Sequence, residues 1–416
     1  MTLSENLQWR GFVNQTTYKD LRVLDGAPIT FYLGVDPSSD SMTVGNLAIV
    51  MMVRHFIEAG HKAILLVGGA TGMIGDPDGK QQERDLLTLD QISHNKQRIS
   101  AQYQQILAGL PFDIVDNYEW FEPMGYLAFL RDVGKHVPMR QMLARDFVQT
   151  RLGETGSGIS YAEFSYALIQ GYDFVYLHRE KGVSLQVCGS DQWGNSIAGV
   201  ELIRRMTGHE AHVWSAPLVV NKSTGKKFGK SEAGAIWLDE AKTSVYKFYQ
   251  FWLNIDDNSA EDYLKLYTLL ARDDIARIQQ EFESNRGGRA IQKALAYEVT
   301  RIVHGQSKAD SAVRTTATLF GSQSYGALTT QDFDFLKNEL PIAHIKVGSD
   351  VVAAVVETGL AASNGEARRS LEQRSIYLNG VQIGPDYKIS REDRMGGGYA
   401  VLRRGKNIHA ILQITE

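Results

Sequence analysis

Short continuous apolar runs mark the first half of the chain. The runs ITFYL at 29–33, AILLV at 63–67 and APLVV at 216–220 have the length of strands, and stretches with helical spacing lie between them. Continuous apolar strands that alternate with helices are typical of a parallel sheet covered on both faces. We therefore predict an α/β domain over residues 1–222.

The pattern changes to helix formers between residues 243 and 320. Apolar residues recur there at three- to four-residue intervals, most clearly from Arg289 until Gly305 ends the pattern. This spacing predicts a helical domain. Residues 321–346 begin with a polar, glycine-bearing stretch that has no clear period, which favours a linker.

The last segment, residues 347–416, has the pattern of a small α+β module. A helical stretch with Arg368 and Arg369 precedes the strand-like run SIYLNGVQI, whose Asn-Gly pair is typical of a hairpin turn. Nine Lys or Arg stand against five Asp or Glu between residues 364 and 406. A basic face of this kind suits a nucleic-acid backbone. A solvated cationic surface explains the same composition, so both interpretations stay open.

Composition excludes several classes of protein. The 416 residues exceed one ordinary domain, and 43% hydrophobic with 22% charged residues excludes disordered and fibrous chains. The net charge of −4 argues against a chain that coats nucleic acid along its whole length. Cys188 is the only cysteine, which favours a reducing, cytoplasmic location. The first residues lack a secretory pattern, and no apolar run approaches the ~20 residues that cross a bilayer.

Two glycine-bearing segments carry the first chemical signals. AILLV runs into GGATGMIGDPDGK, a turn at a strand end where open parallel sheets bind ligands, although a simple tight turn has the same composition. The loop NKSTGKKFGKSE holds Lys222, Lys226, Lys227 and Lys230, and so dense a cluster of cations indicates a triphosphate ligand. This loop is not a P-loop, because Thr224 occupies the position of the first required glycine.

The segment KFGKS resembles the KMSKS signature of class I aminoacyl-tRNA synthetases, and residues 43–46, TVGN, are a degenerate match to their HIGH signature. Further segments resemble bacterial-type tyrosyl-tRNA synthetases: LQWRGFVNQTT, YLGVDPSSDS, VGGATGMIGDP, EFSYALIQGYDF, GSDQWGN, KFGKSEAGAIWLD and YQFWLN. The resemblance covers nearly the whole chain. Its C-terminal part is similar to an S4 RNA-binding domain.

This resemblance implies a fold and a division into domains. It implies a class I Rossmann-type parallel-sheet catalytic domain at 1–222, a KMSKS-type loop and connector at 223–242, an α-helical domain near the tRNA anticodon region at 243–320, a linker at 321–346, and an S4-like domain at 347–416. It also implies a homodimer that activates L-tyrosine with ATP and transfers the tyrosyl group to the 3′-terminal adenosine of tRNA(Tyr).

The implied chemistry needs no protein nucleophile. The carboxylate of tyrosine is already ionised when it attacks the α-phosphorus of ATP, so catalysis depends on positioning and charge stabilisation. The sequence shows no cluster of metal ligands. We therefore expect Mg²⁺ to arrive on the phosphates of ATP, with no prosthetic group.

The candidate tyrosine site centres on the helical segment SYALIQGYD. Tyr166, Gln170 and Asp173 stand there at i, i+4 and i+7, on one face of a helix. By resemblance, Asp173 and Tyr32 bind the phenol of tyrosine, and Asp76, Tyr166 and Gln170 bind its ammonium group. Phenylalanine would leave Asp173 and Tyr32 unpaired, which disfavours it. The same spacing also fits polar residues that only cap a buried face.

The resemblance also implies an ATP site and an RNA site. It assigns pyrophosphate binding to Lys227 and Lys230 with Lys80, Arg84, Ser38 and Thr43, and ribose binding to Gly189 and Asp191. It places Gln192 near the reacting carboxylate and the α-phosphate, and it adds Asp36, Gly45, Asn46 and Ser231 as further residues of the pocket. The residues that it implies for RNA contacts are Arg368, Arg369 and Arg374. The GSDQWG turn also suits a simple helix cap.

Three positions depart from the family pattern. Thr43 and Asn46 replace both histidines of the HIGH signature, and Leu33 stands where many relatives carry cysteine. Threonine and asparagine still donate hydrogen bonds to phosphate or ribose oxygens. Two hypotheses therefore stay open: an active tyrosyl-tRNA synthetase, or a catalytically weak paralogue that binds RNA. The intact lysine loop, Asp173 and Gln192 favour the first.

Overall fold

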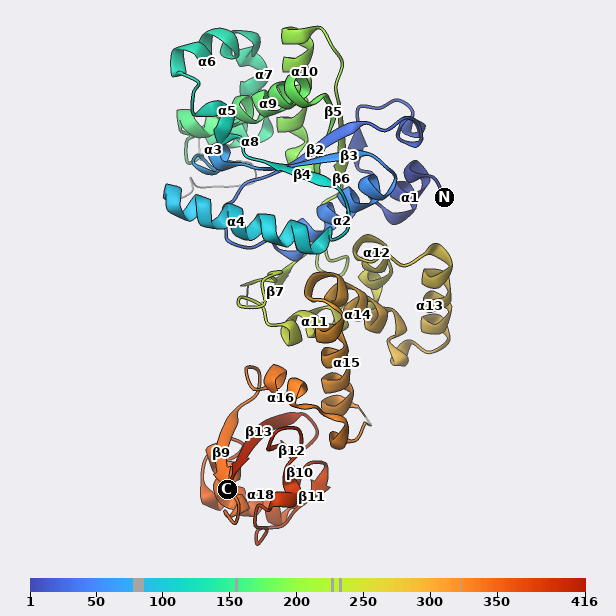
Figure 1. The fold of residues 1–416 in the computed structure, drawn as a ribbon, viewed down its shortest axis with the longest axis vertical. Coiled ribbons are helices and arrows are strands. Elements are labelled where there is room, and N and C mark those ends of the chain that lie inside the picture. The colour runs from blue at the N-terminus through green and yellow to red at the C-terminus, as the bar shows by residue number, and fades with distance from the viewer. Residues whose placement is uncertain (78–85, 154–155, 226–227, 232–233, 322) are drawn as a thin grey trace. The chain divides into compact units, whose positions relative to one another are not determined.

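The computed structural model describes residues 1–77, 86–153, 156–225, 228–231, 234–321 and 323–416 (Figure 1). They form two compact units. Unit 1 consists of Met1–Thr243 and Ile255–Leu295, and unit 2 consists of Ser244–Asn254 and Ala296–Glu416. Within the described ranges, no helix combines the length and the apolar character needed to span a membrane.

Unit 1 is built on a six-stranded sheet in the order β1-β6-β5-β2-β3-β4. Its strands are β1 (Gln15–Thr16), β2 (Thr30–Val35), β3 (Lys62–Val67), β4 (Phe112–Val115), β5 (Val183–Gly189) and β6 (His212–Ala216), and a separate hairpin joins β7 (Lys230–Ser231) to β8 (Gly234–Ala235). All neighbours in the large sheet are parallel except the edge strand β1. The chain runs outward from β2 through β3 to β4 and then returns to β5 on the other side of β2. Such a reversal between adjacent strands is a switch point, where open α/β sheets bind ligands.

Helices cover both faces of this sheet. The helices of unit 1 are α1 (Leu3–Arg10), α2 (Val44–Glu58), α3 (Gly69–Gly72), α4 (Leu89–Ile106), α5 (Tyr118–Phe121), α6 (Tyr126–Asp132), α7 (Met139–Leu143), α8 (Asp146–Leu152), α9 (Tyr161–Lys181), α10 (Trp193–Thr207), α12 (Asp257–Tyr267) and α13 (Arg272–Ser284). In Figure 1, α2 and α4 lie on one face of the sheet, and α9 and α10 lie on the other.

Two successive residues of β2 show how the two faces of the sheet are filled. The ring of Phe31 packs against Phe56 of α2, with 5.0 Å between centroids, and the ring of Tyr32 packs against Phe174 of α9 at 5.2 Å. Because successive side chains of a strand point to opposite faces, a continuous apolar run buries both faces. The strands predicted at 29–33 and 63–67 are confirmed. The run APLVV is not a strand, because β6 ends at Ala216, before a proline that has no N–H for the ladder.

Unit 2 contains a five-stranded sheet in the order β11-β10-β12-β13-β9. Its strands are β9 (Ile342–Lys346), β10 (Ile376–Leu378), β11 (Val381–Gln382), β12 (Tyr399–Arg404) and β13 (Ile408–Thr415), and its helices are α11 (Val245–Leu253), α15 (Gln306–Phe320), α16 (Thr330–Leu336), α17 (Val351–Glu357) and α18 (Asn364–Glu372). Buried aliphatic side chains of α17, α18 and the sheet form its main core. Short 3-10 helices in the two units lie at Leu21–Asp25, Gly134–His136, Ser190–Gln192, Arg286–Gly288, Tyr325–Ala327 and Arg391–Asp393.

Two of the predicted boundaries need correction. The segment 243–320 does not form one separate helical domain: α12 and α13 belong to unit 1, α11 and α15 belong to unit 2, and α14 (Ala290–His304) runs from one into the other. The segment 321–346 is not a linker throughout, because it contains α16 and also β9, which pairs in parallel with β13. Because β13 lies far from β9 in the sequence, the residues of β9 alone do not indicate the strand with which it pairs.

Asp332 anchors α16 within unit 2. Its buried carboxylate accepts hydrogen bonds from the Arg314 guanidinium, at 2.9 Å and 3.1 Å, and from the N–H and hydroxyl of Thr329, at 2.9 Å and 2.8 Å. Burial raises the pKa of Asp332, but the hydrogen bonds from Arg314 and Thr329 outweigh it, and the net shift is downward.

We expect Asp332→Asn to lower the free energy of unfolding of unit 2 by ~1–3 kcal/mol at pH 7, because the amide turns an NH₂ group toward donors. A carboxylate with a lowered pKa stabilises the fold above its ordinary pKa and loses this effect as the pH falls through the lowered value. The difference in free energy of unfolding between the wild type and the Asp332→Asn variant, measured by urea denaturation, should therefore shrink toward pH 3. Asp334→Asn, on the exposed side of α16, is the control, and equal stability of the Asp332 variant and the wild type would contradict the assignment.

Candidate functional site

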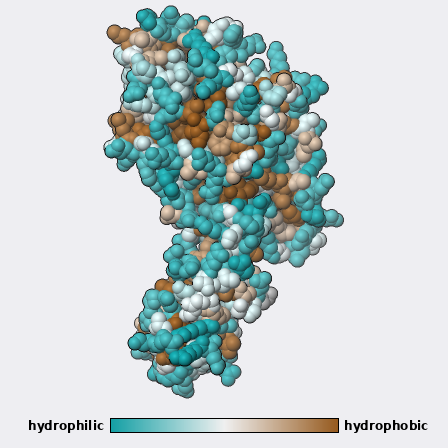
Figure 2. All heavy atoms as spheres, in the orientation of Figure 1, coloured by the Kyte–Doolittle hydropathy of each residue, from teal (hydrophilic) through white to brown (hydrophobic). Residues whose placement is uncertain are grey.

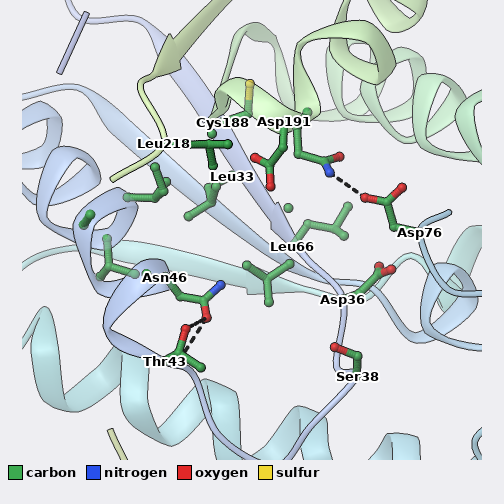
Figure 3. Close-up of a pocket in the computed structure, with 18 of the residues that line it drawn as sticks. Leu33, Asp36, Ser38, Thr43, Asn46, Leu66, Asp76, Cys188, Asp191 and Leu218 are labelled. Carbon is green, nitrogen blue, oxygen red and sulfur yellow. Dashed lines mark hydrogen bonds between the residues drawn. The ribbon is translucent and has the colours of Figure 1, made fainter. Parts of the chain in front are cut away.

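A cavity of about 410 Å³ in unit 1 lies at the switch point of the sheet. It is lined by the C-terminal ends of β2 and β5, the start of α2, and residues of α9 (Figure 3). Thirteen of the residues predicted from the sequence line it: Tyr32, Asp36, Ser38, Thr43, Gly45, Asn46, Asp76, Tyr166, Gln170, Asp173, Gly189, Asp191 and Gln192. Segments that lie far apart in the chain therefore meet at one cavity.

Asp173 of α9 is a buried carboxyl group held by two donors. Its oxygens accept hydrogen bonds from Trp120 Nε1 at 2.9 Å and from Asn117 Nδ2 at 3.1 Å. Asn117 is itself oriented, because its Oδ1 accepts the N–H of Ala70 at 2.7 Å. Burial raises the pKa of Asp173 well above its ordinary value, and the two hydrogen bonds lower it only in part.

Two buried polar atoms that face the cavity have no hydrogen-bond partner within the described chain. They are the hydroxyl of Tyr32 and Oε1 of Gln170. Burial raises the pKa of Tyr32 well above its ordinary value, and the nearby Asp173 adds to the shift. Buried polar groups in folded proteins nearly always have partners, so unpaired ones beside a cavity indicate that a bound ligand supplies them.

Two further carboxylates, Asp36 and Asp76, lie on one side of the cavity (Figure 3). The hydroxyl of Tyr166 donates to Asp36 Oδ2 at 2.8 Å, and Gln192 Nε2 donates to Asp76 Oδ2. Burial raises the pKa of Tyr166, and the charge of Asp36 adds to the effect. Carboxylates at this position make this side of the cavity suitable for a cationic group.

The start of α2 closes another side of the cavity. The N–H and Oγ1 of Thr43 both donate to Asn46 Oδ1, at 3.0 Å and 2.9 Å (Figure 3). The amide oxygen of Asn46 is thus used within the helix end, and its NH₂ group is available as a donor. The N-terminus of a helix of this length also favours negative charge.

The described part of the KFGKS loop lies beside this helix end. The N–H of Val44 donates to Ile236 O at 3.1 Å, and the N–H of Ile236 donates to Gly229 O at 2.9 Å. Gly229 has φ +88°, and a Cβ atom there would lie 2.7 Å from Val44 Cγ2, so this close approach requires glycine. The two segments that resemble the class I signatures are therefore neighbours.

Several predicted residues fall outside the described structure. These are Lys80, Arg84, Lys226 and Lys227, together with the side chains of Lys230 and Ser231. In unit 2, Arg368 and Arg369 lie exposed on α18, and Arg374 is exposed just after it. Among the described residues, no group of three or more His, Cys, Asp or Glu side chains is placed to hold a metal ion.

The sequence analysis did not identify Asn117 and Trp120, which hold Asp173, or Cys188, which lines the cavity. A signal for Asn117 exists in the segment FDIVDN, where two polar residues follow the end of β4. The carboxyl ends of parallel strands meet at one edge of a sheet, so polar residues after them are candidates for a site. Trp120 offers no comparable signal.

Trp120→Phe should remove one donor from Asp173 while keeping an aromatic ring stacked on Tyr176, whose centroid lies 4.4 Å away. The indole N–H stabilises the ionised carboxylate, so the loss in free energy of unfolding should reach ~1–3 kcal/mol where Asp173 is ionised. The pKa of Asp173 is raised, so this loss should be small in the acid range, where the carboxyl group is protonated, and should grow as the pH rises into the alkaline range. Urea denaturation across this range measures the effect, and a loss independent of pH would argue against the role of the N–H.

Comparison with known proteins gives a consistent result. The family model for class I tRNA synthetases (W and Y) matches residues 24–321, and the model for the tyrosine–tRNA ligase SYY-like C-terminal domain matches residues 332–412. The tyrosine–tRNA ligase of Bacillus caldotenax is 43% identical over 423 aligned residues, which cover 99% of this chain and 100% of that protein. The tyrosine–tRNA ligase of Erwinia tasmaniensis is 41% identical and covers 99% and 98%.

A solved structure agrees with the sequence relatives. The C-terminally truncated mitochondrial tyrosyl-tRNA synthetase of Aspergillus nidulans superimposes with a TM-score of 0.69 at 29% identity, covering 77% of this chain and 94% of that one. The cavity lies at the sheet switch point, the two signature segments meet beside it, and full-length relatives share more than 40% identity. The chain therefore belongs to the class I tyrosyl-tRNA synthetases.

Proposed function

We propose that this chain activates L-tyrosine with ATP to give tyrosyl-adenylate and pyrophosphate, and then transfers the tyrosyl group to the 3′-terminal adenosine of tRNA(Tyr). One observation carries the proposal most directly. The hydroxyl of Tyr32 is buried without a hydrogen-bond partner among the described residues, beside the buried carboxyl group of Asp173 on the wall of a cavity. A ligand phenol supplies a partner for the Tyr32 hydroxyl and one more for the Asp173 carboxyl group.

Selection of tyrosine over phenylalanine follows from this pair of groups. A phenol donates to or accepts from each of them, whereas a phenyl ring leaves the Tyr32 hydroxyl without a partner and offers Asp173 nothing beyond the hydrogen bonds from Asn117 and Trp120. A buried polar group left unpaired costs about 1–3 kcal/mol. Asn117 and Trp120 fix the carboxyl group of Asp173, so it cannot turn away to find water.

The part of the cavity that Asp76 and Asp36 line suits the amino-acid end of tyrosine. Asp76 and the oxygen of Gln170 are acceptors for the ammonium group. Tyr166, which the sequence analysis assigned to the same group, orients Asp36 through its hydroxyl and reaches the ammonium through its oxygen. Gln192 lies beside Asp76, where its NH₂ group suits the carboxylate and the α-phosphate.

The start of α2 and the end of β5 suit ATP. The N-terminal N–H groups and dipole of α2, with the NH₂ group of Asn46, favour phosphate oxygens. The hydroxyl of Thr43 donates to Asn46 here, so Thr43 is proposed for the phosphates on its motif alone. Asp191, next to Gly189, offers acceptors for the ribose hydroxyls. Lys227, Lys230, Lys80 and Arg84 are proposed for the pyrophosphate on their motifs alone.

The reaction itself proceeds by displacement at phosphorus. The tyrosine carboxylate oxygen bonds to the α-phosphorus of ATP, the bond from that phosphorus to the bridging oxygen breaks, and pyrophosphate leaves with the electron pair. No proton has to be removed from the nucleophile, so positioning and charge stabilisation supply the catalysis. Mg²⁺ bound to the ATP phosphates would neutralise part of the developing charge.

A homodimer is part of this proposal. Large apolar side chains from residues 126–161 are exposed in the monomer: Tyr126, Leu127, Met139, Leu143, Leu152 and Tyr161. Figure 2 shows apolar groups at several places on the visible surface of unit 1. Exposed apolar area of this kind marks interaction surfaces.

Pyrophosphate exchange into ATP tests the activation step. We expect exchange with tyrosine and far less with phenylalanine, and Tyr32→Phe should reduce the preference for tyrosine by about tenfold, the effect of removing one hydrogen bond to a buried group. Tyr103→Phe is a matched control, because Tyr103 is also buried with an unpaired hydroxyl but does not line the cavity. Folded protein without exchange above background would favour the RNA-binding paralogue instead.

Unit 2 is proposed to bind tRNA through its exposed arginines. Arg368→Gln combined with Arg374→Gln should leave pyrophosphate exchange unchanged and raise the KM for tRNA in aminoacylation. The dependence of tRNA affinity on salt should also become shallower, by about one unit in log–log slope for each arginine–phosphate interaction that the variant removes. Arg22→Gln, an exposed arginine of unit 1, is the control. Aminoacylation unchanged at every salt concentration would contradict the assignment.

A further inference from the structure

A chain of hydrogen bonds leads from Arg145, the residue before α8, through the first turn of α10 to the cavity. Arg145 donates to Asn195 Oδ1 at 2.6 Å and to Gly194 O at 2.7 Å. Asn195 Nδ2 donates to Gln192 Oε1 at 3.2 Å, and Gln192 Nε2 donates to Asp76 Oδ2. Asn195 and Arg145 do not line the cavity, so their effect on it passes through Gln192.

The two ends of this chain determine its direction. The Arg145 guanidinium carries only donors, so the Asn195 atom that faces it must be the amide oxygen. The NH₂ group of Asn195 then faces Gln192, and only the oxygen of Gln192 can accept from it. The NH₂ group of Gln192 is left facing Asp76, which as a carboxylate only accepts.

We propose that Asn195, oriented by Arg145, is a positioning residue for tyrosine activation that keeps the NH₂ group of Gln192 turned into the cavity. The inference rests on the proposed function, in which this NH₂ group meets the reacting carboxylate and the α-phosphate. The opposite orientation of the Gln192 amide would turn its oxygen toward the reacting carboxylate and the α-phosphate, which are both anionic. Asn195 thus determines whether Gln192 attracts or repels the reacting atoms.

Asp76 alone does not secure this orientation once substrate is bound. In the proposed complex the ammonium group of tyrosine binds Asp76 and competes with Gln192 for its oxygens. The bond from Asn195 lies on the far side of the amide and is unaffected by that competition. Asn195 is 3% exposed, and the hydroxyl of Ser196 donates to the carbonyl of Gln192 at 2.8 Å, so the backbone and the side chain of Gln192 are both held.

The isosteric variant Asn195→Asp tests the proposal in the full-length protein. It keeps an acceptor for Arg145 but places an oxygen against Gln192 Oε1, which drives the amide to turn over. We expect kcat for tyrosine-dependent pyrophosphate exchange to fall about tenfold or more, because the interaction that is removed acts on the reacting atoms. The KM for tyrosine should change less than threefold, and the melting temperature should stay within a few degrees.

Combination with Gln192→Ala separates positioning from a direct effect of the new charge. If Asn195 acts through Gln192, Asn195→Asp should cause no further loss of kcat in the Gln192→Ala background, since effects in series do not add. Arg145→Lys, which still donates to Asn195, should retain most of the activity, and Arg145→Met should lose more. Arg204→Gln, an exposed change on the same helix, should leave exchange unaffected.

The outcomes are distinguishable. Wild-type protein without exchange would refute the proposed function itself. Wild-type exchange with an undiminished Asn195→Asp variant, or with losses that multiply in the double variant, would refute the positioning role and leave the proposed function standing.

Discussion

The burial of the Asp173 carboxyl group is the constraint on which the rest of the catalytic unit depends. A carboxyl group removed from water needs donors, and Asn117 and Trp120 supply them from the segment that follows β4. Asn117 is oriented in turn by the N–H of Ala70, at the start of α3. The end of the sheet, α3 and α9 are therefore joined through one buried acid, whose pKa stays raised because the two donors offset its burial only in part.

Groups of opposite electrostatic character line different sides of the cavity. Asp76 and Asp36 lie on one side, and the start of α2, whose N-terminus provides a positive dipole, lies on another (Figure 3). The ammonium group of a zwitterionic amino acid is stabilised by anionic side chains, whereas a polyphosphate is stabilised by a positive dipole. Under the proposed function, the amino-acid end of tyrosine and the phosphates of ATP would occupy these two sides and meet where the carboxylate reaches the α-phosphorus.

Thr43 and Asn46 show how a signature motif is kept with different residues. In place of two histidines, the pair forms a hydrogen-bonded helix start in which the Asn46 oxygen accepts from Thr43. This arrangement leaves amide hydrogens for a ligand while it stabilises the first turn of α2. Gly229 then allows the lysine loop to approach that turn, because no side chain intervenes.

The sequence by itself determined the α/β class, the strands β2 and β3, and the helix face that carries Tyr166, Gln170 and Asp173. These features are local: an apolar run or a helical spacing reports the structure of the residues that contain it. The segments that resemble the family also predicted thirteen residues that line one cavity, because each segment has its own short sequence pattern.

Only the tertiary structure decided the partners of these residues. Trp120 and Asn117 lie more than fifty positions from Asp173, and Arg145 lies fifty positions from Asn195. The position of β9 beside β13 also depends on chain segments that meet through folding. Hydrogen bonds between such distant residues are set by how strands and helices pack, and packing leaves no periodic trace in the chain.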